Sequence, residues 1–156
     1  MSKLTYQPRG RYFEQFAVGD ELVTAARTIT ESDIVNFAGM TGDFNQIHTD
    51  AEFAAQDTFG QRVAHGLLVQ SIATGLAVQS GIIEGTVLAF RELSAKFSLP
   101  VFIGDTVHVA LEITETKALP RLGGGTINMK YAVYNQHGKA VQRGDWVMLI
   151  KNQPSG

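Results

Sequence analysis

One short stretch of the chain carries the side chains best suited to acid–base chemistry. Within residues 41–50, Asp43 and His48 stand five positions apart. On a straight helix, five residues at about 100° each would turn these two side chains away from each other. Gly42 and Asn45 favour an irregular loop instead, which could fold back and bring the carboxylate and the imidazole together. Such a pair could take a proton from water, because histidine titrates near neutral pH. The alternative interpretation is an Asx-turn beside a surface histidine.

A second candidate lies where His65 and Gly66 lead into a long apolar segment. The first N–H groups of a helix have no partner within the helix, and the helix dipole makes that end partly positive. The N–H of Gly66 could therefore stabilise a carbonyl oxygen that gains negative charge during a reaction, and glycine lets a ligand approach closely. The alternative is that Gly66 only begins the helix, while His65 caps it or packs against it.

The segment that follows Gly66 is the element that must position this site. Residues 67–80 are apolar almost all round, and Gly66 and Gly81 bracket them at a length that suits a helix rather than a strand. A helix of this kind must be covered on most sides. A curved sheet wrapped around it would provide that cover.

Shorter helices are expected before this segment, and strands after it. A capping-box pattern at residues 30–33 begins a helix that stops near Gly39 and Gly42, and Asp50 caps a second short helix that ends before Gly60. Period-two alternation then predicts strands over residues 92–99, 107–113, 127–133 and a last one ending with 146–150, with loops at 123–125 and 137–138. Short connections favour antiparallel pairing. The expected fold class is α+β, with an antiparallel sheet around one long helix.

Composition excludes several classes of function. The chain has 156 residues, enough for a single domain (1–156, core about 12–150), and 13 Lys and Arg against 15 Asp and Glu. This balance argues against a nucleic-acid binder. The absence of cysteine excludes disulfides and thiolate chemistry. No signal pattern or long apolar run is present, so we expect a cytoplasmic protein that binds no membrane.

Metal and phosphate motifs are also missing from the sequence. A calcium loop starting at Asp43 would need Gly and Glu where His48 and Ala54 stand. His48, Asp50 and His65 are too few and too irregularly spaced for a metal motif, and residues 123–125 precede no helix that could hold phosphate. We expect no metal and no cofactor.

Four segments in order resemble one protein family. Residues 42–48 (GDFNQIH) and 59–66 (FGQRVAHG) are similar to the hydratase motif of the MaoC-like (R)-specific enoyl-CoA hydratases, with residues 12–20 and 97–105 similar to its flanking segments. The resemblance covers about residues 12–150. One departure is Gln46, because many members have Pro there, and its loss puts the rigidity of the loop in doubt.

The resemblance implies a hot-dog fold and a homodimer, or a higher oligomer of dimers, acting on acyl-CoA or acyl-carrier-protein thioesters. It implies that Asp43 and His48 activate water and that Gly66 is the oxyanion donor. Asn45 would orient the loop. Thr74 would place a hydroxyl near the thioester, and we expect His65 to lie beside the substrate.

The function expected on these grounds is reversible hydration of a trans-2-enoyl thioester to an (R)-3-hydroxyacyl thioester. A hot-dog acyl-CoA thioesterase is the alternative enzyme, because a fold does not determine a reaction. A non-catalytic subunit that binds acyl thioesters is the third possibility. Acyl chain length, carrier and pathway stay open at this stage.

Overall fold

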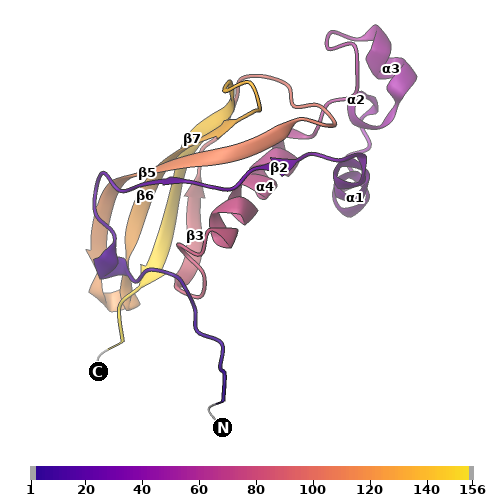
Figure 1. Cartoon of the computed structure of the whole chain (residues 1–156). Coiled ribbons are helices and arrows are strands. Elements are labelled where there is room, and N and C mark those ends of the chain that lie inside the picture. Colours follow the sequence, from indigo (N-terminus) through magenta and orange to yellow (C-terminus); the bar gives the residue numbers. More distant parts are fainter. Residues whose placement is uncertain (1–2, 155–156) are drawn as a thin grey trace.

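The computed structural model describes residues 3–154. They form one antiparallel sheet around a long helix, together with several short helices (Figure 1). The elements, in chain order, are η1 (Phe13–Gln15), β1 (Glu21–Val23), β2 (Arg27–Thr28), α1 (Glu31–Thr41), α2 (Gln46–Thr49), α3 (Ala51–Gln56), α4 (Gly66–Gln79), β3 (Val87–Leu93), β4 (Lys96–Phe97), β5 (Thr106–Leu119), η2 (Pro120–Leu122), β6 (Gly124–Tyr134) and β7 (Ala140–Lys151). The sheet order is β1-β5-β6-β7-β3, with β2 beside β5 and β4 beside β7. Every strand pair is antiparallel. The expected α+β class and hot-dog arrangement are confirmed.

The core lies between α4 and the inner face of the sheet. The helix buries six apolar side chains: Leu68, Val69, Ile72, Ala73, Leu76 and Ala77. They belong to one cluster with alternate residues of the three long strands, such as Val109 on β5, Met129 on β6 and Trp146 on β7. Burial of this much apolar surface is the main favourable contribution to folding. Within the described residues, no helix combines the length and apolarity needed to cross a membrane.

The helices α1, α2 and α3 gather at one end of the molecule, away from both chain termini (Figure 1). The predicted capping box begins α1: Thr30 Oγ1 accepts a hydrogen bond from the N–H of Asp33, and the Asp33 carboxylate accepts one from the N–H of Thr30. Gly42 ends α1 in the left-handed conformation, and Asp50 caps α3 as expected. These caps determine where the intervening loop begins and ends.

The strand predicted over residues 92–99 is wrong in its limits. β3 begins earlier, at Val87, and the strand is interrupted at Ser94, between β3 and β4. The hydroxyl and the N–H of Ser94 both donate hydrogen bonds to Asp145. A Cβ on Gly144 would lie 1.9 Å from the Ser94 carbonyl oxygen, so only glycine allows this close approach. The alternation of residues 92–99 therefore extends across two short strands.

The loop predicted over residues 123–125 is also wrong for two of its three glycines. Only Gly123 forms the turn, in the left-handed conformation, whereas Gly124 and Gly125 are the first residues of β6. A Cβ on Gly124 would lie 2.0 Å from the carbonyl oxygen of Ile150, and one on Gly125 would meet the ring of Phe13. These glycines thus serve close packing within the sheet.

A buried polar cluster joins α4 to the sheet. Gln70 on α4, Tyr131 on β6 and Gln142 on β7 are each at most 5% exposed. Gln70 Oε1 accepts a hydrogen bond from Tyr131 Oη at 2.6 Å and another from Gln142 Nε2. These bonds give partners to three buried polar groups and orient α4 against β6 and β7, whereas Gln70 Nε2 and Gln142 Oε1 have no partner among the described residues.

Candidate functional site

The loop that carries Asp43 leaves α1 through the left-handed turn at Gly42 (φ 81°). The N–H of Asp43 donates to Thr41 Oγ1 at 3.2 Å, and Asp43 Oδ1 accepts the N–H of Asn45 at 3.2 Å. The Asx-turn considered from the sequence is therefore present. It does not exclude a chemical role, because the Asp43 side chain remains exposed to solvent.

A single-turn helix, α2, follows this loop and was not expected from the sequence. Asn45 is its N-cap, with Oδ1 accepting the N–H of Ile47 at 3.4 Å. Gln46 is its first residue, where an N–H has no intrahelical partner and proline would lose nothing. Gln46 therefore occupies a position where a proline would also fit. The capping bond from Asn45 holds the start of this helix.

His48 points from α2 into the protein and is 8% exposed. Its Nδ1 lies 2.7 Å from the carbonyl oxygen of Val63. Because a carbonyl oxygen only accepts, Nδ1 carries the proton and Nε2 is left with a free electron pair. Burial lowers the pKa of His48 below its ordinary value and the His65 ring lowers it further, against the opposing effects of the Val63 carbonyl and Asp43. The ring is therefore a neutral base at neutral pH.

Folding brings Asp43, His48 and His65 together. One side-chain ligand atom from each lies within 4.8 Å of the others. The rings of His48 and His65 stack with centroids 3.8 Å apart. The sequence indicated the Asp43–His48 pair, whereas the third member comes from a segment 17 residues beyond His48. These three groups are the ones that could hold a divalent cation among the described residues.

Gly66 is the first residue of α4, and His65 is its N-cap residue but makes no capping bond with its side chain. A Cβ on Gly66 would lie 2.6 Å from the ring of Phe97, so glycine is required for that ring to cover the start of the helix. Beside it is a cavity of about 410 Å³. The cavity is mostly apolar, and its lining includes Phe59, Leu67, Val69, Phe97, Leu99 and Val141.

Thr74 lies apart from these groups. It is eight residues after Gly66, about 12 Å along the helix at 1.5 Å per residue. Its hydroxyl donates to the carbonyl of Ser71 at 2.8 Å. Thr74 lines a separate cavity of about 280 Å³ beside β3, together with Val87 and Phe90. Within one chain, the structure does not bring Thr74 to Asp43 and His48.

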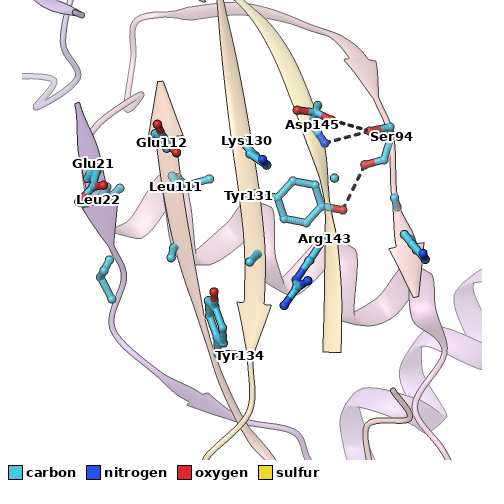
Figure 2. A pocket seen from close by; sticks show the side chains of 16 residues that line it. Glu21, Leu22, Ser94, Leu111, Glu112, Lys130, Tyr131, Tyr134, Arg143 and Asp145 are labelled. Atoms are coloured by element: carbon cyan, nitrogen blue, oxygen red, sulfur yellow. Dashed lines mark hydrogen bonds between the residues drawn. The ribbon is translucent and has the colours of Figure 1, made fainter. Parts of the chain in front are cut away.

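A cavity of about 750 Å³ lies on the outer face of the sheet (Figure 2). Its labelled side chains include Glu112, Lys130, Arg143 and Asp145, from three neighbouring strands. None of the predicted site residues lines it. The chemistry-bearing groups are instead at the end of the molecule formed by α1, α2 and the start of α4.

A family model and several known proteins match this chain. Residues 14–133 match the family described as the MaoC like domain. The chain is 42% identical over 104 residues to protein MaoC of Klebsiella aerogenes, covering 67% of this chain and 31% of that protein. It is 37% identical over 103 residues to an (R)-specific enoyl-CoA hydratase of Rhodospirillum rubrum, covering 66% and 69%.

A solved structure has the same overall fold. The R-hydratase PhaJ1 from Pseudomonas aeruginosa, in its unliganded form, superposes with a TM-score of 0.76 at 31% identity, covering 91% of this chain and 86% of that one. The matched part of the chain covers about a third of protein MaoC and about two thirds of a second curated relative, a 3-hydroxybutyryl-CoA dehydratase of Methylorubrum extorquens. The match to the family covers most of the described residues, including Asp43, His48 and Gly66. The chain therefore belongs to the MaoC-like dehydratase family.

Proposed function

We propose that this protein catalyses the reversible addition of water to a trans-2-enoyl thioester, forming an (R)-3-hydroxyacyl thioester. The observation that carries the proposal is a buried, neutral His48 whose Nδ1 donates to the Val63 carbonyl and which has a ring nitrogen within 4.8 Å of an Asp43 carboxylate oxygen. Two proton acceptors at this separation suit one water molecule, which can donate a hydrogen bond to each.

The reaction follows from these positions. Water held between Asp43 and His48 attacks C3, its oxygen forming the new C–O bond, while one of the two groups takes its proton. The electron pair of the C2–C3 double bond moves toward the thioester oxygen, where the N–H of Gly66 and the dipole of α4 stabilise the negative charge. The electron pair then returns to C2, which takes a proton from the member of the pair that the water protonated. One molecule of water is added and nothing is oxidised or reduced.

The cavity beside Gly66 supports an acyl substrate. Its mostly apolar lining suits a hydrocarbon chain, and its volume of about 410 Å³ is within the range of small-molecule sites. A relative at 37% identity is named an (R)-specific enoyl-CoA hydratase, and another at 38% identity is named a 3-hydroxybutyryl-CoA dehydratase. We propose an acyl-CoA as the carrier form, with acyl-carrier protein as the variant to be compared.

The edge of the sheet supports a homodimer. β3 is the last strand in the sheet order, and all seven of its residues are exposed. They include four large apolar side chains: Val87, Leu88, Phe90 and Leu93. An exposed apolar edge strand is a template for pairing with another chain, and we propose that a second copy covers it. The cavity that Thr74 lines beside β3 would then close against that copy.

The first test is the loss of enoyl-thioester ultraviolet absorbance on adding purified protein to crotonyl-CoA. The Asp43→Asn and His48→Gln variants should lose turnover by about 10²- to 10⁴-fold, the usual contribution of general acid–base catalysis. His137→Gln is the matched control, because His137 lies exposed in the turn between β6 and β7.

The outcomes separate the alternatives. Octenoyl-CoA and a branched enoyl-CoA extend the assay to longer and bulkier chains. Release of free thiol from acyl-CoA would indicate the thioesterase instead. Binding of acyl-CoA without turnover of any of these substrates would indicate a non-catalytic subunit. A fully active, folded Asp43→Asn variant would rule out the assigned pair.

A further inference from the structure

His65 is the most deeply buried polar group of the site, with 2% of its surface exposed. Its ring is enclosed between two other rings. The His48 ring stacks on it at 3.8 Å between centroids, with 26° between the planes. The Phe37 ring, from α1, packs at 5.0 Å and 54°. A ring covered in this way is poorly placed to touch a substrate, so its contribution must come through its neighbours.

One of those neighbours is the backbone of Asp43. His65 Nε2 lies 2.9 Å from the carbonyl oxygen of Asp43. Because this oxygen only accepts, Nε2 donates and carries the ring proton. Nδ1 of His65 is buried and has no hydrogen-bond partner among the described residues. Each of the two site histidines therefore donates one ring N–H to a backbone carbonyl.

This bond is the long-range hydrogen bond of Asp43 itself, whereas the following helix α2 is tied to Val63 through Ile47 and His48. The other hydrogen bonds that Asp43 makes in the described residues reach only Thr41 and Asn45, two positions away. The bond from His65 spans 22 positions and joins the loop to the residue directly before Gly66. A local turn shapes the loop, but only a distant partner can fix its place relative to His48 and α4.

The geometry points to His65 as a positioning residue for the reaction proposed above, acting through Asp43 and His48. Its N–H holds the Asp43 backbone, its ring face supports the ring of His48, and its own backbone begins α4 at Gly66. One side chain thus sets the separation of both water-binding groups from the oxyanion donor. The inference rests on the proposed function only for its effect on rate, since the link between His65 and the loop is a structural property.

Three substitutions separate the two contacts. His65→Gln keeps an N–H that can reach the Asp43 carbonyl but loses the stacked ring. His65→Phe keeps a stacked ring but has no donor. His65→Ala removes both. We expect His65→Phe and His65→Ala to lower kcat by about 10- to 100-fold, because misplacement of about 1 Å can cost that much. His65→Gln should recover most of the loss, and KM should change much less than kcat.

A second measurement is independent of turnover. Amide hydrogen exchange over residues 43–50 should become faster in His65→Phe than in the wild-type protein and return toward wild type in His65→Gln. Ile127→Val is the matched control, because it removes a methyl group from a fully buried position on β6 far along the chain from the loop. It should lower stability without changing the rate or the exchange of this segment.

The kcat values and the exchange rates together distinguish the positioning role of His65 from the proposed hydratase function. The positioning role is supported if kcat falls more in His65→Phe and His65→Ala than in His65→Gln, and if exchange is faster in His65→Phe than in His65→Gln. Unchanged exchange in His65→Phe, or a kcat equal to wild type, would overturn it, as would a kcat loss in Ile127→Val of the same size. If the variants show the expected exchange pattern but the wild-type protein hydrates no enoyl thioester, the proposed function is refuted. The structural link between His65 and the Asp43 loop is then still supported.

Discussion

His48 shows how one buried contact becomes a pH dependence of stability. Its pKa in the folded protein lies below the ordinary value of 6.5, with burial as the largest cause. Between the folded pKa and 6.5, the unfolded chain binds a proton that the folded chain does not. The free energy of unfolding therefore falls as the pH decreases through this window, and the contribution is fully present above it.

We predict that His48→Gln makes the melting temperature less sensitive to pH below about 6.5, the ordinary pKa of histidine. Thermal unfolding followed by circular dichroism at a series of pH values gives the slope, which matters here rather than the absolute stability. His137→Gln should leave the slope as in wild type, because His137 is exposed. Equal slopes for His48→Gln and wild type would contradict the prediction.

At the scale of the element, the glycine inside α1 and the glycine that ends it should respond to substitution in opposite directions. Gly39 lies inside the helix, and a Cβ there meets nothing within 4 Å. Gly39→Ala should therefore stabilise the protein by about 0.5–1 kcal/mol, by reducing the freedom of the unfolded chain. Gly42 ends the helix at φ 81°. Gly42→Ala should destabilise by about 1–2 kcal/mol, because a Cβ is unfavourable in the left-handed region.

Urea denaturation of both variants measures this pair. Gly42→Ala should also reduce turnover, since Asp43 follows directly, whereas Gly39→Ala should not. A change of the same sign in both variants would contradict the predicted opposite effects.

At the scale of the whole molecule, the exposed edge strand β3 allows the proposed dimer to be tested. We predict that the Leu88→Glu, Phe90→Glu double variant shifts the protein from a dimer to a single chain of 16.9 kDa, because it places two charges in the paired edge. Light scattering after size exclusion gives the mass. Val23→Glu is the control, because Val23 is 66% exposed on β1 at the opposite edge of the sheet. A wild-type protein that is already a single chain, or a double variant that stays dimeric, would contradict the proposed interface.

The sequence by itself determined the elements whose causes are local. The capping box at Thr30, the glycine end of α1 and the apolar helix α4 are properties of short windows, and the structure confirms them. The alternation along β5 likewise predicted which side chains face the core, because a strand turns successive residues to opposite faces. Asp43, His48 and Gly66 could be selected as candidates from residue type and motif alone.

Tertiary structure decided everything that depends on contacts between distant segments. His65 joins the site through bonds and stacking with residues 22 and 17 positions away. Gly124 and Gly125 belong to a strand because β7 and Phe13 pack against them, whereas composition alone indicated a loop. Gln70 interrupts an apolar helix in the sequence, yet it is buried because Tyr131 and Gln142 supply its partners from 61 and 72 positions away. Secondary-structure propensity and hydrophobic periodicity act over a few residues. The fold alone therefore determines which distant groups meet and which ring nitrogen of each histidine donates a hydrogen bond.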